Sequence, residues 1–134
     1  MINNKRIILI ADDKEFIRDM FEAYIDTTLP GYSGEYINNG KDFEARLKRN
    51  LDGVVLAIID NNMPPGKKGI DIIREYASRV KFRFALHTGD WTRDELGEEA
   101  QKIREEVQKL GAIYLPKPCD YSKLPELVRS VARG

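Results

Sequence analysis

The sequence predicts an α/β fold: a doubly wound, five-stranded parallel sheet with five helices distributed over both of its faces. Short apolar runs alternate with longer amphipathic runs along the whole 134-residue chain. The apolar runs are nearly continuous, which is typical of strands that are buried on both faces. Strands that alternate with helices join through right-handed crossovers into a parallel sheet, and 134 residues suit one domain, residues 1–134.

The strands are predicted from the apolar runs. Arg6–Ala11 is one such run, and Val54–Ile59 is the clearest, with six apolar residues that stop at Asp60. Three further strands are predicted at Gly34–Ile37, Phe82–His87 and Ala112–Leu115. For a small sheet of this kind the common strand order is 2-1-3-4-5, the flavodoxin-like arrangement.

The helices are predicted from amphipathic periodicity. They are expected at Lys14–Leu29, Lys41–Asn50, Ile70–Val80, Thr92–Leu110 and Leu124–Ala132. The first is expected to bury a face that carries Phe16, Met20, Ala23 and Tyr24. The fourth begins with a sequence that resembles a capping box, Thr92–Glu95, and has an apolar stripe at Leu96, Ala100, Ile103, Val107 and Leu110.

Composition narrows the functional classes. Lys and Arg together number 22, as do Asp and Glu, so no net charge attracts the chain to nucleic acid or to an anionic membrane. The single cysteine, Cys119, cannot form an internal disulfide, and no apolar run approaches the roughly 20 residues of a spanning helix. We therefore expect a cytoplasmic protein with protein partners, and neither direct nucleic-acid binding nor membrane association.

Polar residues follow four of the predicted strands. They are Asp12 and Asp13, then Asp60, then Thr88, then Lys117. In a 2-1-3-4-5 sheet these strand ends meet at one rim, where such folds bind their ligands. Any one of these aspartates could instead be a turn former or a helix cap. Three crowded carboxylates, however, repel one another and need a cation.

Mg²⁺ is the predicted cation, because the ligands are all oxygen atoms. Together with Lys117 it would balance the three negative charges. A carboxylate can attack phosphorus to form an aspartyl phosphate, while a metal and a lysine offset the charge on the phosphoryl oxygens. Asp60 is the best candidate nucleophile, since it ends the most apolar strand.

Four segments resemble the signature stretches of response-regulator receiver domains in two-component signalling. They are Ile8–Asp13, Ile58–Pro64, Leu86–Gly89 and Tyr114–Pro118, and they occur in the family's order and approximate spacing over nearly the whole chain. The resemblance implies that Asp60 accepts a phosphoryl group from a histidine kinase or a histidine phosphotransfer protein. It also implies that Asp13, Asp60 and the backbone carbonyl of Asn62 bind Mg²⁺, with Asp12 assisting mainly through water.

The resemblance assigns further roles by position. Lys117 would pair with the phosphoryl group, while Thr88 and the aromatic Tyr114 would move on phosphorylation. The surface of helix 4, strand 5 and helix 5 would then change for a downstream protein partner, and a homodimer is possible. Asn62 and Asp90 match positions that line the path of the hydrolytic water, and their polarity predicts a comparatively short-lived aspartyl phosphate.

Other features depart from the pattern or need testing. The peptide bond Lys117–Pro118 matches one that is typically cis in the family. The loop from Asp60 to Gly69 is one residue longer than usual, and its Lys67 and Lys68 are predicted to be a solvated tip. The lengthened fourth helix could alter partner choice.

Two other functions remain open. A receiver-like module could bind partners without phosphorylation. An aspartate-based phosphohydrolase of the haloacid dehalogenase type would need a second acid two residues after its nucleophile, where this chain has Asn62.

Overall fold

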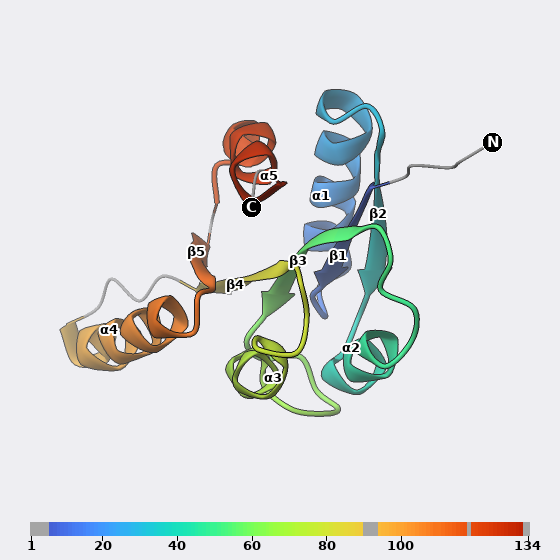
Figure 1. The fold of residues 1–134 in the computed structure, drawn as a ribbon. Coiled ribbons are helices and arrows are strands. Elements are labelled where there is room, and N and C mark those ends of the chain that lie inside the picture. Colours follow the sequence, from blue (N-terminus) through green and yellow to red (C-terminus); the bar gives the residue numbers. More distant parts are fainter. Residues whose placement is uncertain (1–5, 90–93, 118, 133–134) are drawn as a thin grey trace.

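The fold comes from a computed structural model, which describes residues 6–89, 94–117 and 119–132. Its centre is a parallel sheet in the order β2-β1-β3-β4-β5, which confirms the predicted topology (Figure 1). The strands are β1 (Arg6–Ala11), β2 (Tyr32–Ile37), β3 (Val54–Asp60), β4 (Arg83–Gly89) and β5 (Ile113–Lys117).

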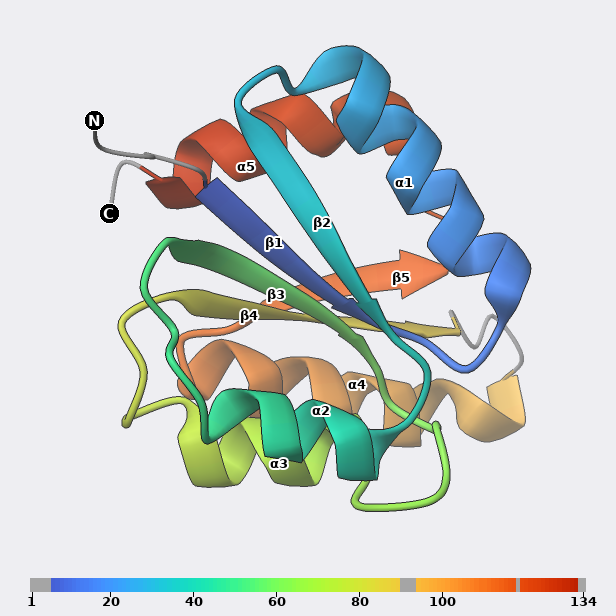
Figure 2. The ribbon, with the colours of Figure 1, turned by 90° about the vertical axis from the view of Figure 1, so that its right-hand side faces the viewer.

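Helices cover both faces of the sheet. They are α1 (Glu15–Thr28), α2 (Gly40–Leu47), α3 (Gly69–Tyr76), α4 (Asp94–Lys109) and α5 (Leu124–Ala132), with a 3₁₀ turn, η1 (Tyr121–Lys123), before α5. Figure 2 shows α1 and α5 on one face and α2, α3 and α4 on the other. No helix within the described ranges is both long and apolar enough to cross a membrane.

The core consists of two layers, one on each side of the sheet. Because successive side chains of a strand point to opposite faces, Ile8 and Ile10 of β1 pack toward α1 and α5. Leu9 and Ala11 pack toward the other three helices. Burial on both faces is the reason that β1 and β3 are nearly continuous apolar runs.

The buried face of α1 differs from the predicted one. Phe16 is 64% exposed, Met20 is 39% exposed and Ala23 is also exposed, whereas Phe21 and Ile25 are buried at 1% and 0%. The helix carries two apolar stripes of helical period, and periodicity alone does not show which one faces the sheet. The prediction of a Phe16–Met20–Ala23 core face was wrong.

Tyr24, the fourth residue of that predicted face, is half-buried. Its ring stacks on Tyr121 of η1, with centroids 5.4 Å apart and an interplanar angle of 18°. This contact links α1 to the segment between β5 and α5.

The fourth helix agrees with its predicted stripe where it is described. Ala100 and Val107 are buried, and Ile103 and Leu110 pack against the same core layer. Gly97 lies inside α4 and does not end it. The start of the predicted capping box, at Thr92 and Arg93, lies outside the described residues.

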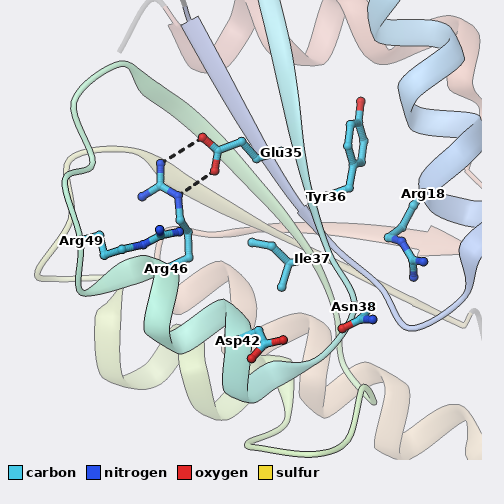
Figure 3. A pocket seen from close by; sticks show the side chains of 8 residues that line it. All are labelled: Arg18, Glu35, Tyr36, Ile37, Asn38, Asp42, Arg46 and Arg49. Carbon is cyan, nitrogen blue, oxygen red and sulfur yellow. Dashed lines mark hydrogen bonds and ion pairs between the residues drawn. The ribbon is translucent and has the colours of Figure 1, made fainter.

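The buried Arg46 of α2 forms an ion pair with the partly exposed Glu35 of β2 beside a cavity of about 400 Å³ (Figure 3). Its Nε and Nη2 donate to the two carboxylate oxygens of Glu35 at 2.7 and 3.3 Å, and Nη1 donates to the Asn50 carbonyl at 2.8 Å. The pKa of Glu35 is lowered by the hydrogen bond from Arg46, against an opposing effect of burial, with smaller contributions from the charges of Arg46 and Arg49.

We expect Glu35→Gln to lower the free energy of unfolding by about 1–2 kcal/mol at pH 7, because a charge-assisted bond is lost while Glu35 remains partly exposed to screening. Glu35 has a folded-state pKa below its unfolded value, so its contribution is complete above the unfolded pKa and disappears as pH falls through the folded value. Urea titrations of both proteins at pH 7 and at pH 3 measure this. A difference that grows toward pH 3 would contradict the assignment.

β5 lies at one edge of the sheet and contains Pro116. Proline has no backbone N–H, and it is tolerated at an edge because an edge strand need not donate every hydrogen bond. The predicted strand order, which places the fifth strand at an edge, is confirmed.

Candidate functional site

Three carboxylates converge at the carboxyl ends of β1 and β3. Asp12 and Asp13 directly follow β1, and Asp60 is the last residue of β3. Carboxylate oxygens of the three residues all lie within 4.8 Å of one another. Asp12 and Asp60 are buried at 1% and 5% exposure, whereas Asp13 is exposed. The rim predicted from the strand order therefore brings these side chains together.

Lys117, at the end of β5, reaches across to two of these carboxylates. Its Nζ lies 2.9 Å from Oδ2 of Asp12 and 3.3 Å from Oδ1 of Asp60. Burial acts to lower the pKa of Lys117, but the hydrogen bond to Asp12 and the charge of Asp60 outweigh it and raise the pKa. The ammonium is thus charged at neutral pH and bridges the two buried acids.

Asp12 is held by the backbone as well as by Lys117. Its Oδ1 accepts a hydrogen bond from the Lys14 backbone N–H at 2.9 Å, and its carbonyl accepts one from Arg18 at 2.8 Å. Among the described residues, Asp13 has only a loose ion pair with the Lys14 amine, at 3.7 Å. The exposed Asp13 is therefore the acid most free to take another partner.

Asp60 lies in an environment that disfavours its charge. Burial raises the pKa of this carboxyl and the negative charge of Asp12 raises it further, against the opposing effects of Lys117 and of the Asn62 N–H. A cation at this rim would stabilise the ionised form. Negative charge is therefore in excess at this site, as it is at sites that bind metal cations.

Thr88 and Tyr114, the two predicted switch residues, lie on β4 and β5. Asp60 pairs in register with His87, so Thr88 follows one residue further along β4, and it is 7% exposed. Tyr114 is half-buried on β5, and the Arg104 guanidinium lies 4.8 Å from its ring centre. Its hydroxyl is buried and has no hydrogen-bond partner among the described residues. The switch roles of both residues stay predictions.

The loop after Asp60 contains one structural residue that the sequence reasoning missed. Asn61 accepts hydrogen bonds from the Ile70 N–H through Oδ1, at 3.0 Å, and from the Gly69 N–H through its carbonyl, at 2.9 Å. Asn62, the predicted metal and hydrolysis residue, has an exposed side chain. Asp90 and the predicted cis bond at Pro118 lie outside the described residues.

His87 is a packed residue of β4. It is 1% exposed, and its ring meets Phe21 edge-on at 5.4 Å. Burial, assisted by the charge of Lys117, lowers the pKa of His87 to about 4, so the ring is neutral at pH 7. It also contributes to an apolar cavity of about 500 Å³ between α1 and η1, where the exposed Phe16 and Met20 lie.

Comparison with solved structures identifies the fold. A response regulator receiver protein from Pseudomonas putida is 26% identical, with a TM-score of 0.73, over 94% of this chain and 97% of that one. A CheY-like response regulator receiver domain protein from Methanospirillum hungatei JF-1 is 20% identical, with a TM-score of 0.77, over 96% and 94%. Full-length FixJ from B. japonicum is 25% identical, with a TM-score of 0.75, over 96% and 58%.

No family model and no curated protein matches the sequence. The likeness is therefore carried by the three-dimensional structure, together with 26% identity over nearly the full length of the Pseudomonas putida protein. The strand order and the five helices that cover the sheet are also those of the receiver domains. The chain has the fold of the CheY-like response-regulator receiver domains.

Proposed function

We propose that residues 1–134 form one receiver domain whose Asp60 accepts a phosphoryl group. The observation that carries this proposal is the position of Asp60, at the end of β3, 3.3 Å from the Lys117 ammonium and beside the two other acids. A buried carboxylate with a lysine and further acidic ligands next to it is suited to become an aspartyl phosphate.

The acids fit Mg²⁺. Its ligand oxygens lie about 2.1 Å from the ion, and it retains several waters, so carboxylates within 4.8 Å of one another can share one ion directly or through water. Asp13, Asp60 and the Asn62 carbonyl are the proposed direct ligands, and Asp12 acts mainly through water. When bound, the ion offsets negative charge on the transferred phosphoryl oxygens.

The proposed donor is the phosphohistidine of a sensor kinase or of a phosphotransfer protein. A carboxylate oxygen of Asp60 forms a bond to phosphorus as the phosphorus–nitrogen bond breaks, and the electron pair of that bond returns to the imidazole. Lys117 then pairs with the phosphoryl oxygens, and the Thr88 hydroxyl donates to one of them.

The signal would be passed on at the β5 edge of the sheet. Movement of Thr88 and Tyr114 shifts the population of the surface formed by α4, β5 and α5 toward an arrangement that a downstream protein binds. Asn62 and Asp90 would set a short lifetime for the phosphorylated form. We place this signalling in the cytoplasm, and self-association through the output surface would yield the possible homodimer.

Phosphorylation with a small donor tests the proposal. Acetyl phosphate with Mg²⁺ is expected to add one phosphoryl group to the wild type, and Asp60→Asn is expected to abolish the added mass in intact-protein mass spectrometry. Asp52→Asn, which changes an exposed acid elsewhere, serves as the matched control. Labelling that survives in Asp60→Asn would contradict the assignment, and a wild type that is never labelled would favour a phosphorylation-independent module.

A further inference from the structure

The acceptor loop, defined as residues 61–68, is bonded to the start of α2. The Gly40 N–H donates to the Met63 carbonyl at 2.8 Å, and the Lys41 N–H donates to the Pro65 carbonyl at 2.9 Å. The first amides of a helix have no acceptor within the helix. Here the loop supplies those acceptors, so the acceptor loop and α2 are joined through their backbones.

Two glycines make this approach possible. A Cβ atom on Gly66 would lie 2.3 Å from the Lys41 backbone nitrogen, and one on Gly40 would lie 2.5 Å from the Lys67 carbonyl oxygen. Both clashes are with backbone, which cannot turn aside as the end of a side chain can. Gly66 also has φ +115°, a conformation that other residues rarely adopt.

The loop is anchored at two more points. Met63 is 1% exposed and belongs to the core layer under α2, α3 and α4. Lys67 forms ion pairs with Glu44 of α2 and Glu75 of α3, and Tyr76 donates to Glu44 at 3.1 Å. Lys67 and Lys68 were predicted to be a solvated tip, and both are exposed; Lys67 in addition forms its ion pairs with acids of two neighbouring helices.

We propose that the contact between Gly40 and Gly66 is a positioning device for the metal site. Asn62 directly precedes Met63, whose carbonyl is bound by Gly40, so a shift of the loop away from α2 moves the Asn62 carbonyl with it. Mg²⁺ tolerates little departure from octahedral geometry. The close packing of the two glycines therefore sets the affinity for the ion. This inference rests on the proposed function, which makes the Asn62 carbonyl a ligand.

The test is calorimetric titration with Mg²⁺ alone. Gly66→Ala is expected to weaken Mg²⁺ binding at least tenfold, and its phosphorylation by acetyl phosphate is expected to recover as Mg²⁺ is raised. Gly111→Ala is the matched control: Gly111 has φ +76°, but nothing lies within 4 Å of its added Cβ. It shares the backbone strain without the clash, and its Mg²⁺ affinity is expected to equal that of the wild type.

A second pair covers the case in which Gly66→Ala does not fold. Gly40→Ala is compared with Gly97→Ala, a helical glycine whose added Cβ also meets nothing within 4 Å. Lys67→Met keeps the backbone and removes one anchor, and it is expected to weaken Mg²⁺ binding two- to fivefold. Folded variants that bind Mg²⁺ within twofold of their controls would overturn the positioning role alone. A wild type that does not bind Mg²⁺ would overturn the proposed function as well.

Discussion

Lys117→Met is expected to lower the free energy of unfolding by about 3 kcal/mol in Mg²⁺-free buffer, because it leaves Asp12 and Asp60 buried together without their shared cation. Methionine has a similar length and apolar stem, so the loss is mainly one of charge. Urea unfolding with EDTA measures the change. The same variant is expected to accumulate no detectable aspartyl phosphate, since the phosphoryl oxygens lose their ammonium partner.

Mg²⁺ provides the internal check on this result. The ion can replace part of the missing positive charge. Mg²⁺ at about 10 to 20 mM, which should saturate the site, is therefore expected to stabilise Lys117→Met more than the wild type. Lys68→Met, at an exposed lysine of the acceptor loop, is the control and should change stability by less than about 0.5 kcal/mol. Equal unfolding energies for Lys117→Met and Lys68→Met would show that Lys117 does not hold the acids together.

The second large effect is expected in α1, where two phenylalanines have opposite environments. Phe21→Ala should cost about 3–5 kcal/mol, because a ring that is 1% exposed and packs against His87 and Tyr121 is replaced by a cavity. Phe16→Ala, on the same helix at 64% exposure, should cost less than about 0.5 kcal/mol. Thermal unfolding of both variants measures the difference, and a greater loss for Phe16→Ala would reverse the orientation of α1.

The sheet and its rim were predictable because they depend on local patterns. Continuous apolar runs such as Val54–Ile59 identify buried strands, and the parallel topology then brings their carboxyl ends together. This topology alone was enough to predict that one site contains Asp12, Asp13, Asp60 and Lys117. The strand ends shifted by only a few residues, for example β2, which begins at Tyr32 rather than Gly34.

The contacts between elements were not predictable in the same way. The two stripes of α1 have the same period, and only packing against the sheet decides that Phe21 rather than Phe16 is buried. The approach of Gly66 to Gly40 joins residues 26 positions apart through backbone atoms, which leave no trace in hydrophobic periodicity. Asn61 resembles an ordinary loop residue, and its two accepted hydrogen bonds depend on where α3 begins.

Pro116 also bears on how copies of this chain meet one another. An open sheet border can recruit a further strand from a neighbouring molecule, and such recruitment begins aggregation. At the β5 border a proline interrupts the row of amide donors that an incoming strand would need. Intermolecular sheet extension is therefore disfavoured on this side, so crowded copies are protected from fibre-like growth through β5.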